Sequence, residues 1–244
     1  MNPIQAIANV LIDILNILHG WVRSYGLAII LLTVVIRAAL HPLTRKSLRS
    51  MRAMQALAPQ MAVLREKYRD DPRAMNTEMM NLYRANNVNP FSGCLPQLVQ
   101  LPVLYALFAA LRRPNLFGAE TFLGMALDKA PCPHLSPSCL IDLVHQPLVL
   151  AIILGVGATT YLQQRMSITD PQQARMFLFM PILVAYFALG FQIALSIYWV
   201  VSTLVYMLEY YIVVGRPGFV PAGPAPPKAS PPLLPQRPKG TKKR

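Results

Sequence analysis

Apolar and charged residues occupy separate long blocks along the chain, rather than alternating at the short periods of a soluble domain. An apolar helix of about 20 residues crosses the roughly 30 Å hydrocarbon core of a bilayer. Stretches of about this length lie at 21–40, 94–111 and 143–162, and a longer one lies at 176–214. The longest is too long for one span, so we divide it near Gly190–Gln192. The pattern predicts an all-α membrane protein with a five-transmembrane-helix bundle.

The segment before the first predicted span has its own helical period. Its apolar residues recur at intervals of three and four: Ile4, Ile7, Leu11, Ile14 and Leu18. Polar residues fill other positions, so residues 1–20 are predicted to form an N-terminal amphipathic interfacial helix on the outer membrane surface. A targeting segment is the alternative, although the basic start of a secretory signal is missing.

The segment 41–91, between the first two spans, is predicted to be a cytoplasmic helical hairpin. One helical face carries apolar side chains at Met51, Met54, Leu57, Met61, Leu64 and Tyr68. Pro59 predicts a kink or a new helix start. Asp71 followed by Pro72 predicts the N-cap of the second helix. The methionines either pack the two helices together or offer an adaptable surface to partners.

Charge predicts the orientation in the membrane. The chain is 54% hydrophobic and still carries a net charge of +13. Eighteen Lys and Arg residues fall in the loops 41–91 and 163–175 and in the tail 215–244, against four on the other side. The positive-inside rule therefore puts these segments in the cytoplasm and the N-terminus outside. The Pro-rich basic tail cannot bury a core, so we expect it to be disordered and drawn to an anionic membrane or RNA surface.

Two cysteines lie close together in a predicted outer loop, where oxidation is permitted. Cys132 and Cys139 could form a local disulfide there or remain free thiols, and the sequence leaves both open. A zinc site is disfavoured, because His134 lies between them without a standard ligand spacing.

Arg37 lies inside the first apolar run, where a charge at the membrane centre costs about 2.5–3.5 kcal/mol on insertion scales. Two interpretations stay open. The arginine either snorkels to the cytoplasmic interface, four residues before His41, or faces a wet cavity inside the bundle. The first four spans offer it no acidic partner, and the partner of Glu209 in the last span cannot be identified from sequence.

Several segments resemble the YidC/Oxa/Alb family of membrane protein insertases. They are "TVVIRAALHPLT", "NVNPFSGCLPQLVQLPVLYAL" and "MPILVAYFALGFQIALSIYWVVSTL", in the family's order over roughly residues 15–214. The resemblance implies a short bacterial type, located in the bacterial cytoplasmic (inner) membrane. It departs from the family's pattern at "ALSIYW", which loosens the assignment of the aromatic residues there.

The resemblance also implies a hydrophilic groove that is open to cytoplasm and lipid and closed outside. The positions that match its lining are Arg37, Thr33, Gln164, Tyr198 and Trp199, with Gln163 adjoining. Newly made membrane proteins would pass from this groove into the bilayer. The implied partners are nascent membrane proteins, membrane lipids and the ribosome, which would contact the basic hairpin and tail. The sequence leaves open whether the Sec translocon takes part.

Other functional classes find little support in the sequence. Nucleotide-binding, zinc-protease and serine-nucleophile motifs are missing from the sequence. We therefore expect that the protein is not an enzyme and that it has no cofactor and no metal site. A small-solute secondary transporter is the stronger alternative, because polar residues within spans would serve it too. The odd number of spans and the lack of an internal repeat count against it.

Overall fold

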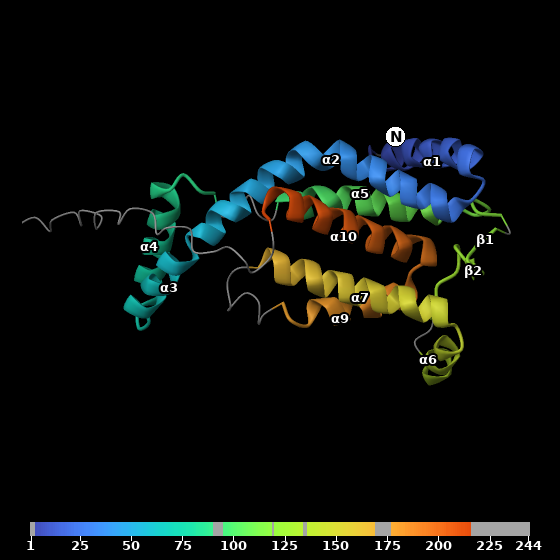
Figure 1. The fold of residues 1–244 in the computed structure, drawn as a ribbon. Coiled ribbons are helices and arrows are strands. Elements are labelled where there is room, and N and C mark those ends of the chain that lie inside the picture. Colours follow the sequence, from blue (N-terminus) through green and yellow to red (C-terminus); the bar gives the residue numbers. More distant parts are fainter. Residues whose placement is uncertain (1–2, 90–94, 119, 134–135, 169–176, 216–244) are drawn as a thin grey trace, which may run out of the picture.

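The structure is a computed structural model that describes residues 3–89, 95–118, 120–133, 136–168 and 177–215. Its longer helices are α1 (Pro3–Val22), α2 (Tyr25–Ala56), α5 (Leu95–Leu111), α7 (Pro147–Ser167), α9 (Met180–Gly190) and α10 (Ile193–Val213). The shorter elements are α3 (Ala58–Lys67), α4 (Pro72–Ala85), β1 (Thr121–Phe122), β2 (Met125–Ala126) and α6 (Pro137–Val144). Figure 1 shows an elongated bundle with α3 and α4 beyond one end and the two strands at the other. We call these the hairpin end and the strand end.

Helix α10 is the centre of the bundle. Eleven of its 21 residues are buried. It packs mainly on α2 and α7, while α9 covers α7, and α1 packs on α5 and α2 (Figure 1). Helices α2 and α10 run in the same direction, from the strand end to the hairpin end. Side chains that lie equally far from the strand end on α2 and α10 can therefore meet across the interface of the two helices.

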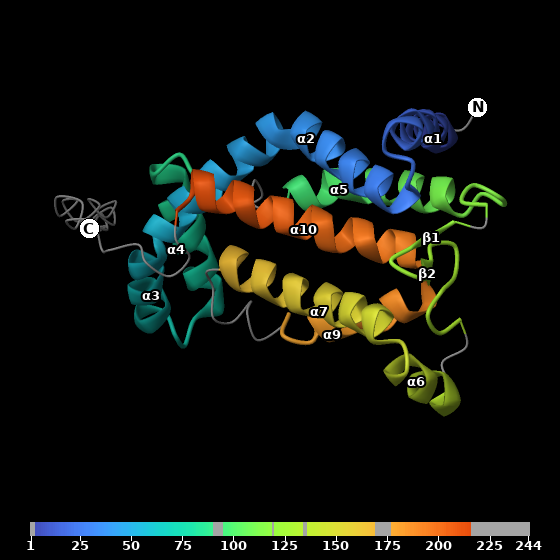
Figure 2. The same cartoon turned by 45° about the vertical axis from the view of Figure 1, so that its right-hand side comes forward.

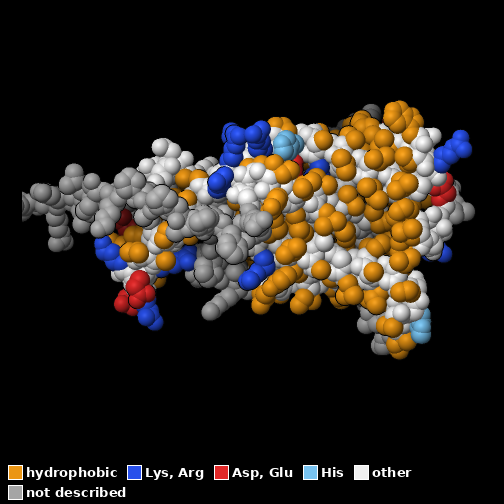
Figure 3. All heavy atoms as spheres, in the orientation of Figure 1, with side chains coloured by type: hydrophobic (Ala, Val, Ile, Leu, Met, Phe, Trp, Pro, Cys, Tyr) orange, Lys and Arg blue, Asp and Glu red, His pale blue; other side chains and the backbone are white. Residues whose placement is uncertain are grey.

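The outer surface of the bundle is apolar. Large hydrophobic side chains are exposed on several helices, including Leu154 and Leu162 on α7, Ile182 on α9, and Leu208 and Ile212 on α10. Figure 3 shows this apolar cover over one face of the bundle, with several Lys and Arg side chains toward the hairpin end. Soluble monomers rarely expose apolar patches of this extent, so the surface is that of a membrane-embedded protein.

The all-helical membrane fold is confirmed, with differences in the spans. Among the described residues, four helices are long and apolar enough to cross a bilayer: α1, α2, α7 and α10. Helices α5 and α9 are apolar but shorter, and α9 rises only about 16 Å at 1.5 Å per residue. The division of the last apolar stretch is confirmed, because α9 ends at Gly190 and α10 begins at Ile193. The count of five spans stays a prediction.

The helix that contains most of the predicted first span, 21–40, has different ends from that span. Helix α2 begins at Tyr25 and continues to Ala56, with Pro42 inside it. Trp21 belongs to the last turn of α1, where 82% of its surface is exposed. Tertiary packing explains the extension, since Leu48 and Met51 are buried against Tyr206 and Tyr210 of α10.

Helix α1 crosses the bundle instead of running along it. Figure 2 shows α1 end-on while α2, α7 and α10 are seen along their lengths. Its most buried side chains are Ala8, Leu11, Ile12 and Leu15, so only Leu11 of the predicted apolar face is fully buried. A second apolar stripe with Ile7, Val10, Ile17 and Trp21 stays exposed. The helix therefore has two apolar faces, one of which packs on α5 and α2.

The hairpin beyond α2 follows its sequence signals. Helix α3 begins one residue after Leu57, with Pro59 in its first turn. The N-cap predicted at Asp71 is confirmed, because its carboxylate accepts from the backbone N–H groups of Arg73 and Ala74 at 3.1 and 3.0 Å. The hydroxyl of Tyr83 on α4 lies 3.4 Å from Sδ of Met61 on α3. The predicted tail lies outside the described residues apart from Gly215, as do Cys94 and His134.

The loop that contains β1 and β2 covers the strand end of the bundle. Phe122 of β1 packs directly on Gly26 of α2, where a Cβ would lie 2.1 Å from the ring. The carbonyls of Leu127 and Lys129 accept from the first N–H groups of α10, each at 3.1 Å. Such groups have no partner within their own helix, so the loop satisfies them.

The disulfide that the sequence left open is formed between Cys132 and Cys139, whose Cα atoms lie 5.8 Å apart. The backbone N–H of Cys132 donates to the carbonyl of Leu189 in α9 at 2.7 Å. The bridge therefore links the loop that covers α9 and α10 to the short helix α6.

Candidate functional site

Arg37 faces the interior of the bundle. Only 8% of its surface is exposed, and its Nε donates to Oγ of Ser202 on α10 at 2.8 Å. Its guanidinium carbon lies 5.8 Å from the centre of the Tyr206 ring, also on α10. The interpretation that Arg37 snorkels to the interface is therefore wrong. No carboxylate of the described residues lies within ion-pair distance of it.

A small polar cavity lies beside Arg37, with a volume of about 30 Å³. Its lining comes from α2, α5, α7 and α10: Arg37, Gln100, Leu104, Gln163, Tyr198, Trp199, Ser202 and Thr203. A space of this size with several polar partners accommodates water. Most of these side chains are neutral donors or acceptors, and the guanidinium is the only cation among the described residues of the lining.

Hydrogen bonds across helices fix the shape of this cavity. The amide of Gln100 on α5 donates to the hydroxyl of Tyr198 on α10. The indole N–H of Trp199 donates to Oγ1 of Thr160 on α7 at 3.0 Å. Each bond crosses between two helices, so α10 is tied to a different neighbour on each side.

The five residues matched to the family's groove are only partly brought together. Arg37, Tyr198 and Trp199 line the polar cavity. Thr33 is fully buried one turn earlier on α2, where its hydroxyl donates to the carbonyl of Ile29. Gln164 points elsewhere and donates to the carbonyl of Phe177 at 2.9 Å. The neighbouring Gln163 takes the position in the cavity lining.

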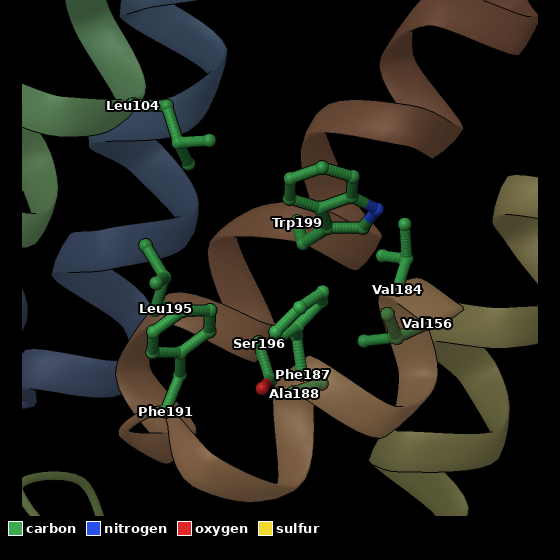
Figure 4. A pocket seen from close by; sticks show the side chains of 9 residues that line it. All are labelled: Leu104, Val156, Val184, Phe187, Ala188, Phe191, Leu195, Ser196 and Trp199. Atoms are coloured by element: carbon green, nitrogen blue, oxygen red, sulfur yellow. The ribbon is translucent and has the colours of Figure 1, made fainter. Parts of the chain in front are cut away.

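A larger apolar pocket of about 290 Å³ adjoins the polar cavity on the side of α9. Figure 4 shows its side chains converging from α5, α7, α9 and α10. Leu104 and Trp199 line both spaces. Ser196 is the single polar residue of the pocket lining, and its Oγ is buried without a hydrogen-bond partner among the described residues. A charged, polar space and an apolar space therefore share a wall.

The partner of Glu209 is His41, a pair that sequence reasoning missed. Nδ1 of His41 lies 2.6 Å from Oε1 of Glu209. The imidazole is 44% exposed, whereas the carboxylate side chain is 9% exposed. Oε2 of Glu209 is buried and has no hydrogen-bond partner in the described part of the chain. Both residues have ionisable side chains that are evident in the sequence, but their pairing depends on how α2 and α10 align.

Comparison with known proteins shows the family to which the chain belongs. A family model described as 60Kd inner membrane protein matches residues 17–217. Membrane protein insertase YidC 2 of Bacillus anthracis is 39% identical over 201 residues, which cover 79% of this chain and 72% of that protein. The chain belongs to the YidC/Oxa family of membrane protein insertases. Membership supports the expectation that it is not an enzyme, since these relatives are named for insertion.

Other YidC relatives are much longer than this chain. The YidC insertases of Maridesulfovibrio salexigens and Pelobacter propionicus are each 39% identical to it, over 215 and 201 residues. The matched regions cover 85% and 81% of this chain but only 38% and 36% of those proteins. The chain thus spans less than two fifths of the length of these two relatives.

A solved structure shares the fold. The crystal structure described as active YidC insertase with the first transmembrane domain resolved matches with a TM-score of 0.64 at 23% identity. The match covers 84% of this chain and 46% of that chain. The YidC-like fold is therefore confirmed, and the chain is a multi-pass membrane protein of a family named for the inner membrane.

Proposed function

We propose that the protein inserts newly synthesised membrane proteins into the bilayer. The observation that supports this most directly is the buried Arg37, which lines a polar cavity within a bundle whose outer surface is apolar. A charged side chain inside the membrane is energetically costly, so such residues are rare and usually serve a function. The relatives named as insertases give the same function to the family.

The cavity would lower the barrier for a polar segment that must cross the membrane. The unassisted crossing passes through about 30 Å of hydrocarbon. Water beside Arg37 shortens that path, and the guanidinium attracts acidic residues of the crossing segment. The cavity would widen as the segment enters, since about 30 Å³ holds only a few water-sized groups.

The apolar pocket beside the cavity suits the other part of the substrate. The spanning segment of a nascent membrane protein gains free energy when its apolar side chains leave water. Because Trp199 and Leu104 line both spaces, a chain in the polar cavity would have its apolar part next to the pocket. The substrate would then leave sideways into lipid.

The charge distribution supports an orientation with the hairpin end in the cytoplasm. The part of α2 that leads into the hairpin carries the exposed residues Arg45, Arg49 and Arg52, and positive segments stay on the cytoplasmic side. The N-terminus and the disulfide-bearing loop would then lie outside, and α1 would lie along the outer surface. Contacts of the basic hairpin with the ribosome, and cooperation with the Sec translocon, remain predictions.

Site-specific photocrosslinking to a ribosome-stalled membrane protein tests this function. A photoreactive residue replaces Gln163 or Trp199 at the cavity, and Leu31, which is exposed on α2, serves as the lipid-facing control. Thr33 and Gln164 are probed in the same way, because the family resemblance places them in the groove. We expect crosslinks from Gln163 and Trp199 and not from Leu31.

A second readout separates the function from the site. Vesicles that contain only this protein should insert a labelled membrane protein. Insertion without cavity crosslinks would show that the groove assignment is wrong while the function stands. Failure of both, together with saturable uptake of a small solute, would favour the secondary transporter instead.

A further inference from the structure

The buried carboxylate of Glu209 follows Arg37 along the same helix interface. On α2, His41 lies one turn after Arg37. On α10, Ser202, Tyr206 and Glu209 succeed one another at helical spacing, so they share one face. Arg37 contacts the first two of these residues and His41 contacts the third. Arg37 and Glu209 therefore lie along the same α2–α10 interface, although they form no direct ion pair.

A purely structural role explains this pair poorly. His41 satisfies Oε1 of Glu209, but Oε2 stays buried without a partner in the described residues. A buried carboxylate that is only half hydrogen-bonded costs stability. A neutral amide could accept the same bond from His41 at a lower desolvation cost. The negative charge itself thus needs an explanation, and the nearby guanidinium provides one.

We propose that Glu209, held by His41, is the counter-charge of Arg37 and determines which charged segments the cavity accepts. The inference rests on the proposed insertion function. With Glu209 present, the positive field of Arg37 is partly cancelled, so segments with basic residues are tolerated beside acidic ones. Without it, the cavity carries an uncompensated positive charge in a low-dielectric setting, which favours acidic segments and excludes basic ones.

The test compares substrates that differ only in the charge of the translocated tail. Three otherwise identical single-spanning proteins carry Asp, Asn or Lys in that tail. Their insertion is measured in phosphatidylethanolamine–phosphatidylglycerol vesicles containing the full chain, either wild-type, Glu209→Gln or Glu209→Asp. Glu66→Gln is the matched control, since it changes the net charge equally at an exposed position on α3, away from the cavity.

We expect Glu209→Gln to raise the ratio of acidic-tail to basic-tail insertion roughly three- to tenfold. Glu66→Gln should leave the ratio unchanged, and Glu209→Asp should keep it near the wild-type value because the charge remains. An equal loss for all three tails in Glu209→Gln would show that the residue only ties α2 to α10. An unchanged ratio would also overturn the proposal.

Failure of the underlying function is distinguishable from failure of this inference. If wild-type vesicles insert none of the tails, both proposals fall. If the wild type inserts all three and Glu209→Gln changes no ratio, only the counter-charge proposal falls. A poorly folded Glu209→Gln variant would also insert less of every tail, so the ratio among the tails that it still inserts decides: a raised acidic-to-basic ratio sustains the proposal, and an unchanged ratio overturns it.

Discussion

Two serines on α10 provide a matched pair for testing how Arg37 is held in the bundle. Ser202 and Ser196 are both buried, at 4% and 3% exposure, on the same helix. Ser202 accepts a hydrogen bond from Nε of Arg37, whereas Oγ of Ser196 has no partner among the described residues. Replacing each by Ala removes one hydroxyl of the same size. The two variants therefore differ mainly in whether hydrogen-bonded neighbours, Arg37 and Tyr198, lose the bond to a hydroxyl.

The expected magnitudes follow from this difference. A hydrogen bond to a charged group contributes about 1.5–3 kcal/mol in soluble proteins, but measured bonds within membranes average about 0.6 kcal/mol with a maximum of about 1.7. We therefore expect Ser202→Ala to lower the free energy of unfolding by about 1–2 kcal/mol. Ser196→Ala removes an unsatisfied hydroxyl, so it should be neutral or stabilise by up to about 1 kcal/mol.

The assay is reversible unfolding in mixed micelles with increasing sodium dodecyl sulfate, followed by tryptophan fluorescence. Trp199 is the useful reporter, because Trp21 is largely exposed in the folded protein. The wild type and both variants are compared under the same conditions. An equal loss for the two variants would refute the reasoning, since it would mean that the bond to Arg37 contributes nothing beyond the packing of a small side chain.

Three further perturbations have expected outcomes at other parts of the fold. Gly26→Ala should destabilise the protein by about 1–3 kcal/mol in the same assay, because the new Cβ would clash with the Phe122 ring; an unchanged stability would mean that β1 does not pack there. Asp71→Ala should cost about 1 kcal/mol by removing the N-cap of α4, seen as faster amide exchange confined to the hairpin. Reduction of Cys132–Cys139 should loosen the loop over α9 and α10, seen as faster exchange at Ile193 and Ala194; unchanged exchange would show that the backbone bonds alone hold it.

Local signals in the sequence predicted much of the secondary structure. The Asp71–Pro72 pair marks the start of α4 because both residues act on their own first turn. The turn at Gly190–Gln192 was predicted from the length of the apolar stretch, which exceeds one membrane thickness. The orientation of α1 was harder to predict, since residues with apolar side chains lie on both of its faces and only contacts with α5 and α2 decide which face is buried.

The site depended more strongly on packing. A one-residue offset separates Gln163, which lines the cavity, from Gln164, which bonds to Phe177. Successive residues on a helix point about 100° apart, so the choice depends on the rotation of α7 against α10. The rotation of α7 against α10 cannot be read from the local sequence pattern. Gln100 and Ser202 are polar residues within apolar stretches of the sequence, but their contacts cannot be assigned from the sequence alone.

The sequence by itself determined that this is a helical membrane protein of the YidC/Oxa family with a charged residue inside its first predicted span. Those properties depend on local composition, on the bilayer thickness and on motifs that are contiguous in the chain. The tertiary structure decided that Arg37 faces Ser202, that His41 meets Glu209, and that a polar cavity and an apolar pocket share Trp199. The two residue pairs lie 165 and 168 positions apart in the chain, so only the alignment of the helices in space brings them together.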